Sequence, residues 1–238
     1  MMNKVFTISD LHLSFSRPKP MDIFGDHWIN HPRKIANRWK EKVQDTDVVL
    51  IGGDISWAMK LADAILDLEF IDELPGQKVI IRGNHDFWYP KSAQKRKSLP
   101  SSITALYRSS CVINEIAYIG CKGLSFDEDD VKDVVVYEKN LKRQVGNLDA
   151  SMKHLIASGK NYSSIVAMVH YPPAGLGQII SPITELLEGY GVSKCIYGHL
   201  HTEEDFKNAI SGDIGSVSYF LTSADYLSFE PLQLCPSV

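Results

Sequence analysis

A short apolar run passes directly into two glycines and an aspartate in the stretch VVLIGGD, residues 48–54. The continuous apolar character of Val48–Ile51 predicts a strand that is buried on both faces. The glycines let the chain turn sharply off the strand, which places Asp54 directly beyond its carboxyl end. Because ligands of open α/β sheets collect at the carboxyl ends of strands, this stretch predicts an α/β protein with Asp54 in its functional site.

The same pattern recurs along the chain, since four further apolar runs end in polar residues suited to metal binding. These runs and the residues that follow them are Val5–Ile8 before Asp10 and His12, 79–81 before Asn84, His85 and Asp86, 165–169 before His170, and 195–197 before His199 and His201. Helix-compatible segments lie at 34–43, 61–71 and 137–157. The alternation of strands and helices predicts a layered α/β architecture.

The remaining segments complete this picture. Residues 116–120 and 217–232 are more typical of antiparallel strands with turns, as expected if a sheet is completed late in the chain. Residues 15–28 and the acidic segment 127–132 fit no regular element, and we expect loops there. Without a repeat, a low-complexity tract or a Gly- or Pro-rich linker, the simplest interpretation is one domain over 1–238.

Composition narrows the class of protein. The chain has 238 residues, of which 44% are hydrophobic and 23% charged, so a sizeable core is expected. A formal charge of −4 gives no overall basic field for nucleic acid. We find neither a signal sequence nor an apolar run of about 18 residues, and we therefore expect no membrane segment. Four scattered cysteines are interpreted as reduced thiols of a cytoplasmic protein.

The histidines supply the strongest signal. Short motifs such as His-x-His are weak when taken one at a time. Five of the eight histidines nevertheless follow predicted strand ends, and only His27, His31 and His154 do not. An independent placement of five structural histidines at such positions is a poor explanation for the pattern, which favours a shared site.

The ordered motifs Asp-x-His, Gly-Asp, Gly-Asn-His-Asp, His and Gly-His-x-His resemble those of the calcineurin-like metallophosphoesterase superfamily. The resemblance extends from Asp10 to His201, and the stretches around Trp57 and Tyr171 resemble a bacterial branch of uncharacterised phosphoesterases. It implies mixed sheets in a layered β-sandwich flanked by helices, the four-layer α/β/β/α architecture of the family. No motif position departs from the family pattern.

The resemblance also implies a ligand set for two divalent metal ions. One ion would be bound by Asp10, His12 and His201, the other by Asn84, His170 and His199, and Asp54 would bridge the two. Carboxylate, amide and imidazole donors without thiolate suit Mn, Fe or Zn rather than a Ca²⁺ cage or an iron–sulfur cluster. The implied activity is hydrolysis of a phosphomonoester or phosphodiester by a metal-activated hydroxide, without a covalent enzyme intermediate.

The resemblance also implies catalytic roles for two residues that would not bind metal. His85 would donate a proton to the leaving group or stabilise the transition state, and Asp86 would orient its ring. The alternative for Asp86 is a turn or helix-capping residue.

Substrate-binding candidates lie near the first two motifs. Arg17, His27 and Trp28 belong to the loop after His12, and Trp57 follows the bridging Asp54. They would bind a small phosphoester or nucleotide-like substrate, although Trp28 and Trp57 are also compatible with packing.

Two other functions remain open. A nuclease for short or single-stranded nucleic acid is supported by aromatic residues 87–89 and by the basic residues Lys91, Lys95, Arg96 and Lys97. The negative net charge favours a solvated helix face for this cluster instead. A non-catalytic metal-binding scaffold is the third hypothesis, and the intact ligand set argues against it.

Overall fold

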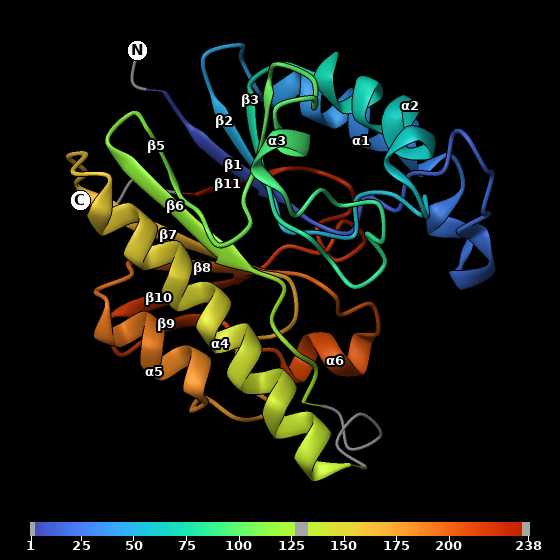
Figure 1. Ribbon diagram of the computed structural model, residues 1–238. Coiled ribbons are helices and arrows are strands. Elements are labelled where there is room, and N and C mark those ends of the chain that lie inside the picture. The colour runs from blue at the N-terminus through green and yellow to red at the C-terminus, as the bar shows by residue number, and fades with distance from the viewer. Residues whose placement is uncertain (1–2, 127–132, 235–238) are drawn as a thin grey trace. The chain divides into compact units, whose positions relative to one another are not determined.

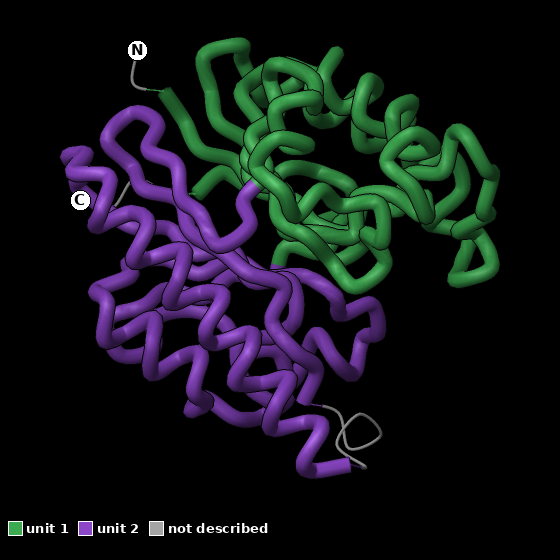
Figure 2. Tube along the Cα trace, viewed as in Figure 1, with its two compact units in different colours: residues 1–105, 222–236, 238 green, residues 106–221, 237 purple. Residues whose placement is uncertain are grey.

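The computed structural model describes residues 3–126 and 133–234, which divide into the two compact units of Figure 2. Among these residues, unit 1 comprises 3–105 and 222–234, and unit 2 comprises 106–126 and 133–221. The chain thus leaves unit 1, builds unit 2 and returns to unit 1. The interpretation of 1–238 as one domain stays a prediction.

Unit 1 contains a five-stranded sheet of order β11-β1-β2-β3-β4. Its strands are β1 (Val5–Ile8), β2 (Val48–Ile51), β3 (Gln77–Ile80), β4 (Ile103–Ala105) and β11 (Leu232–Leu234). The pairs from β1 to β4 are parallel, while β11 runs antiparallel to β1. Every side chain of β1 and β2 is buried, as the continuous apolar runs predict.

The crossovers of unit 1 are helical. The helices are α1 (His31–Lys42), α2 (Leu61–Asp72) and the short α3 (Ala93–Arg96). Right-handed crossovers between neighbouring parallel strands place consecutive helices on one face of the sheet, and α1 and α2 lie there together (Figure 1). Trp39 of α1 is fully buried and its indole N–H donates to the carbonyl of Pro75 over 2.9 Å, so this tryptophan is a core residue.

Unit 2 contains a six-stranded sheet of order β5-β6-β7-β8-β10-β9. Its strands are β5 (Cys111–Ile113), β6 (Ile116–Cys121), β7 (Ser164–Val169), β8 (Lys194–Tyr197), β9 (Gly212–Ile214) and β10 (Val217–Leu221). The four central strands are parallel and both edge strands are antiparallel to their neighbours.

The helices of unit 2 are α4 (Val134–Ala157), α5 (Pro182–Gly189) and α6 (Glu203–Asn208). Leu148 and Leu155 of α4 and Leu187 of α5 belong to one buried cluster with alternate residues of the strands, such as Ala167 and Tyr219. This period-two pattern shows that α4 and α5 cover one face of the sheet (Figure 1).

The predicted α/β class, with mixed sheets flanked by helices, is confirmed. Three local expectations need correction. Within residues 217–232, which were expected to form antiparallel strands, β10 pairs antiparallel with β9 but parallel with β8. Residues 116–120 pair antiparallel with β5, as predicted, but parallel with β7. Residues 15–28 contain two 3₁₀ turns, Asp22–Phe24 and Asp26–Trp28, because Gly25 turns the chain between them with a φ of 131°. The acidic segment 127–132 lies outside the described residues.

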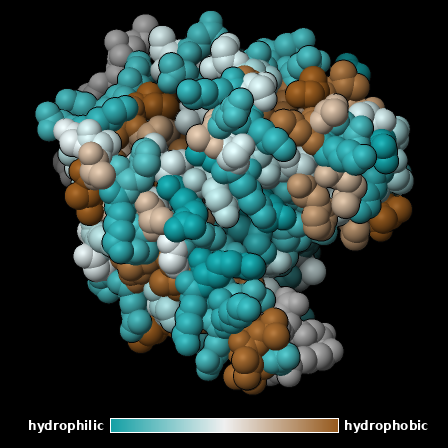
Figure 3. Space-filling model, in the orientation of Figure 1, coloured by the Kyte–Doolittle hydropathy of each residue, from teal (hydrophilic) through white to brown (hydrophobic). Residues whose placement is uncertain are grey.

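The surface seen in Figure 3 is mostly hydrophilic, with separate hydrophobic patches. Exposed hydrophobic side chains include Ile23 and Phe24 in unit 1 and Val134 to Val136 at the start of α4 in unit 2. Within 3–126 and 133–234, no helix combines the length and apolar character needed to cross a membrane.

Candidate metal centre

The strand ends of unit 1 are aligned by the register of the sheet. Ile8 pairs with Ile51, and Ile51 pairs with Ile80, so β1, β2 and β3 end at the same level. The segments that follow them therefore emerge at one edge of the sheet, as the sequence predicted. This register positions Asp10, His12, Asp54 and Asn84.

The backbone beyond these strand ends adopts left-handed conformations at three of the predicted ligands. The φ angles are 58° at Asp10, 47° at His12 and 50° at Asp54. The conformation costs a non-glycine residue roughly 1 to 2 kcal/mol, and such residues cluster at functional sites. The amide of Asp10 donates to the carbonyl of Gly53 over 2.9 Å and that of His12 donates to the carbonyl of Asp54 over 3.0 Å, which holds the two segments side by side.

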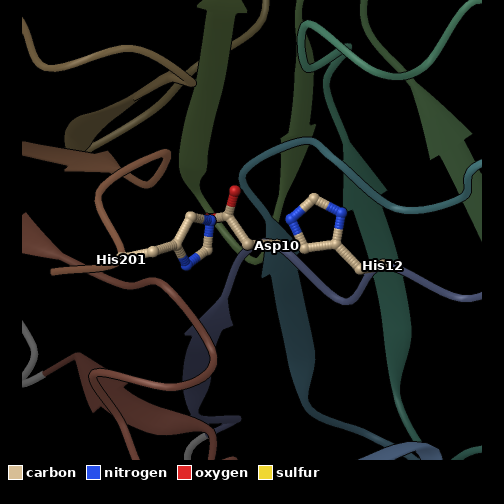
Figure 4. Close-up of side chains that lie close together, drawn as sticks. All are labelled: Asp10, His12 and His201. Carbon is tan, nitrogen blue, oxygen red and sulfur yellow. The ribbon is translucent and has the colours of Figure 1, made fainter. Parts of the chain in front are cut away.

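The aligned segments bring two buried carboxylates together. Ligand oxygens of Asp10 and Asp54 lie within 4.8 Å of one another, and a ring nitrogen of His12 lies within the same distance of an Asp10 oxygen. The Nε2 atom of His12 is 4.0 Å from Oδ2 of Asp54. Figure 4 shows Asp10 and His12 on the segment after β1; the third side chain drawn, His201, belongs to unit 2.

The position of Asp54 is supported from the segment after β3. Its Oδ1 accepts a hydrogen bond from the backbone amide of His85 over 2.8 Å. The chain approaches so closely at Gly83 that an added Cβ would lie 2.0 Å from that oxygen and 2.2 Å from the Asp54 nitrogen. Gly83 is therefore required by close approach, whereas Gly53 is required by its φ of 98°.

Asp86 supports the same region, but through the backbone. Its Oδ1 accepts from the amides of Ile55 (2.9 Å) and Ser56 (3.1 Å) and from the indole of Trp88 (3.0 Å), and its Oδ2 accepts from Gly83 (2.8 Å). Burial raises the pKa of this carboxyl to about 6, opposed by these hydrogen bonds.

The expectation that Asp86 orients the His85 ring stays a prediction. Its carboxylate oxygens contact the four donors named above. These hydrogen bonds hold the segment that carries Asp54, which is close to the turn role considered as the alternative.

His85 itself is partly open to solvent. Its side chain is 39% exposed and its Nε2 lies 3.9 Å from Oδ2 of Asp54. Its ring centroid is 4.2 Å from that of Trp57 and 5.9 Å from that of His12. Its imidazole is thus half-buried and lies close to the buried carboxylate of Asp54.

Unit 2 holds the other three predicted ligands after β7 and β8. His170 is fully buried and its ring lies 5.3 Å from that of His199, in an edge-to-face arrangement. The amide of Gly198 donates to the carbonyl of His170 over 3.0 Å, and His199 has a φ of 74°. His201 is exposed and follows two residues later.

Two supporting residues escaped the sequence analysis. His31 is buried, and its ring nitrogens contact the carbonyls of Trp28 (3.1 Å) and His12 (3.3 Å). Burial lowers the pKa of His31. Asp67 of α2 is also buried, accepts hydrogen bonds from the amide of Phe15 and the hydroxyl of Ser56, and has a pKa raised by burial.

The predicted substrate-binding residues differ in their surroundings. Trp28 is buried and packs edge-to-face on His31 and Phe229, with centroid distances of 5.2 and 5.1 Å. Arg17 is 72% exposed at its side chain and lies 3.5 Å from Asp63. His27 is exposed and Trp57 is half-buried. Their roles in substrate binding stay predictions.

The donors fit divalent metal ions in each unit considered by itself. In unit 1, two buried carboxylates within 4.8 Å repel one another in a medium of low dielectric, and a cation relieves that repulsion. In unit 2, the neighbouring imidazoles of His170 and His199 supply nitrogen donors. Carboxylate and imidazole together suit Mn, Fe or Zn.

Comparison with known proteins agrees with these findings. The chain matches the calcineurin-like phosphoesterase family over residues 4–203, and it belongs to that family. The Gene 66 protein of Mycobacterium phage L5 is 35% identical over 97 residues, which cover 41% of this chain and 46% of that protein. The chain thus matches less than half the length of this relative.

Two solved structures are similar across most of both chains. The phosphopantetheinyl hydrolase PptH of Mycobacterium tuberculosis has a TM-score of 0.54 at 13% identity, with 99% of this chain and 97% of that chain covered. AQ665 of Aquifex aeolicus, described as a protein of unknown function, has a TM-score of 0.48 at 14% identity, with coverages of 97% and 95%. The likeness to PptH supports the fold.

Proposed function

We propose that this calcineurin-like phosphoesterase hydrolyses a small phosphomonoester or phosphodiester with two divalent metal ions. The ligands would be Asp10, His12, Asp54, Asn84, His170, His199 and His201. The observation that supports this best is the pair of buried carboxylates, Asp10 and Asp54, both held in left-handed backbone conformations. Metal ions bound there would lower the pKa of water and offset the negative charge that develops on the phosphoryl group.

The protein's own residues would perform the remaining steps. The Asp54 carboxylate accepts a hydrogen bond from the His85 amide, which would hold it in position as negative charge develops on the phosphoryl group. The partly exposed His85 imidazole would donate a proton to the leaving-group oxygen as a positioned general acid. Asp86 would contribute by positioning the segment that carries Asp54.

The proposal also concerns which phosphoesters are substrates. PptH is described as a phosphopantetheinyl hydrolase, and its fold is shared here at 13% identity. Phosphopantetheine esters therefore belong in the substrate panel, beside nucleotides and simple aryl esters.

The test is hydrolysis of p-nitrophenyl phosphate and bis(p-nitrophenyl) phosphate by metal-stripped protein, with Mn²⁺, Fe²⁺, Zn²⁺ or Mg²⁺ restored singly. We expect turnover with at least one metal and a loss of at least about a hundredfold in Asp54→Asn, because an amide binds these metals less well than a carboxylate. The exposed Asp45 offers a matched control, and Asp45→Asn should retain activity. Metal binding without turnover of either ester would favour the scaffold hypothesis instead.

A further inference from the structure

A lysine is held over a tryptophan in the loop that follows His12. The ammonium of Lys19 lies 3.1 Å from the ring centroid of Trp57, and the indole nitrogen of Trp57 is 3.3 Å from the sulfur of Met21. The amide of Lys19 donates to the hydroxyl of Ser14 over 3.1 Å, and that hydroxyl donates to the Lys19 carbonyl over 3.3 Å. Lys19 is exposed, yet its backbone and its side chain are both held by these contacts.

The tryptophan beneath this lysine also contacts the proposed catalytic histidine. The Trp57 ring centroid is 4.2 Å from that of His85 and 4.9 Å from that of His12, which it stacks upon. The Lys19 ammonium and the ring of the proposed proton donor thus both contact the same indole ring. With a lysine and two imidazoles already against it, Trp57 has little ring area left for stacking a nucleobase.

The charge of Lys19 is not neutralised by a neighbouring carboxylate. Arg17, two residues earlier, lies 3.5 Å from Asp63 of α2. Lys19 forms no such ion pair with any residue in the described ranges, and its ammonium contacts the indole instead. An anchored cation beside a site for phosphate esters is suited to binding a second anion.

We propose that Lys19, held by Trp57 and Ser14, forms an anion subsite for the leaving group of the substrate. The preferred substrates would be phosphoesters whose leaving group carries a second phosphate or a carboxylate. Lys19 would bind the leaving group and not the transferred phosphoryl group, because His85, which would protonate the leaving-group oxygen, lies next to Trp57. This inference rests on the proposed phosphoester hydrolysis, and it makes Lys19 a specificity-determining residue.

The experiment compares two matched esters, 4-carboxyphenyl phosphate and its neutral amide 4-carbamoylphenyl phosphate, with the metal-loaded full chain. The readout is the ratio of the two kcat/KM values in the wild type, Lys19→Met, Lys19→Arg and Lys40→Met, where Lys40 is an exposed lysine of α1. We expect a preference of about fivefold for the carboxylate, equivalent to about 1 kcal/mol for an exposed ion pair. Lys19→Met should abolish the preference, while Lys19→Arg and Lys40→Met should retain it.

The outcomes separate the subsite from the activity. Equal turnover of both esters by the wild type, or an equal loss for both esters in Lys19→Met, would overturn the subsite and leave phosphoester hydrolysis standing. Turnover of neither ester by the wild type, under metal conditions in which a p-nitrophenyl ester is hydrolysed, would overturn the subsite alone. If the p-nitrophenyl monoester and diester are not hydrolysed either, the proposed hydrolysis is overturned and the subsite with it.

Discussion

Four of the proposed metal ligands have strained backbone conformations. Asp10, His12, Asp54 and His199 all have positive φ angles, and none of them is glycine. Residues in such conformations persist when the surrounding structure holds them in place, and here the amide–carbonyl contacts between the two ligand segments do so. The cost in stability is consistent with residues kept for binding rather than for packing.

The close approach of Gly83 to Asp54 can be tested by substitution. We expect Gly83→Ala to displace Asp54, because a Cβ at this position would lie 2.0 Å from Oδ1 and 2.2 Å from the backbone nitrogen of Asp54. Metal affinity should fall at least about tenfold and the free energy of unfolding by about 2 kcal/mol or more. Calorimetric metal titration and urea unfolding measure the two effects.

Gly146→Ala is the matched control. Gly146 lies within α4, where nothing approaches its added Cβ within 4 Å. Alanine should stabilise this helix by up to about 1 kcal/mol and leave metal affinity unchanged. Similar metal affinities for the two alanine variants would contradict the role given to Gly83.

Residue types and strand ends indicated a shared polar site, and the resemblance to the family implied which seven residues would be its metal ligands. The support around them could not be predicted in the same way. Nothing in the sequence shows that His31 reaches the carbonyl of His12, or that the Asp86 carboxylate is occupied by four donors, because these contacts depend on how distant segments pack. A charged residue at a buried helical position, Asp67, is the one signal that a closer analysis of α2 could have used.

At the scale of elements, helices and strands with a continuous or periodic apolar pattern were predicted well, whereas strands of three residues were not. The predicted strand 48–51 matches β2 in full, and the predicted helix 61–71 differs from α2 by one residue. The short elements β4, β5 and β9 escaped prediction, because three residues carry too little pattern to be recognised. The antiparallel pairing of β6 with the edge strand β5 likewise depends on β5 and not on the sequence of β6 alone.

Lys78 of β3 connects two elements and makes stability depend on pH. Its buried ammonium donates to the carbonyls of Asp72 and Leu74, at the end of α2 and beyond it, and to the hydroxyl of Ser102. Burial lowers the pKa of Lys78 to about 8, against an ordinary value of 10.5. Between these pH values the unfolded chain binds more protons than the folded one, so the contribution of Lys78 to stability increases as pH rises.

We therefore compare the free energy of unfolding of the wild type with that of Lys78→Met from pH 7 to pH 11. The wild type should gain about 2 to 3 kcal/mol relative to the variant between about pH 8 and pH 10.5. Subtracting the variant removes the effects of the other titrating groups. If the difference in free energy of unfolding between wild type and variant stays constant over this pH range, burial does not lower the pKa of Lys78.

At the scale of the whole molecule, the chain order explains how unit 1 is completed. The chain leaves this unit after Ala105 and returns at Thr222, where Ser9 and Thr222 share a buried hydrogen bond of 2.7 Å. Strand β11 then pairs with β1. The sequence analysis expected a late strand to complete a sheet, and this expectation is confirmed.

We expect from the net charge of the molecule that small substrates are preferred over polynucleotides. Lys91, Lys95 and Lys97 are exposed around α3, while the formal net charge is −4. Reversing these three lysines to glutamate should leave kcat/KM for p-nitrophenyl esters within about twofold, because long-range fields act mainly on highly charged partners. Assays on single-stranded oligonucleotides check the alternative, since a selective loss of their cleavage would support the nuclease hypothesis.

The central claim is that hydrolysis requires two metal ions, and its most direct test is a titration of activity with metal. Stripped protein receives increasing amounts of the best metal under tight-binding conditions, and turnover of the preferred p-nitrophenyl ester is measured at each addition. The account predicts no turnover without metal and a plateau reached at two equivalents per chain. Full turnover in the presence of chelator, or a plateau at one equivalent, would contradict it.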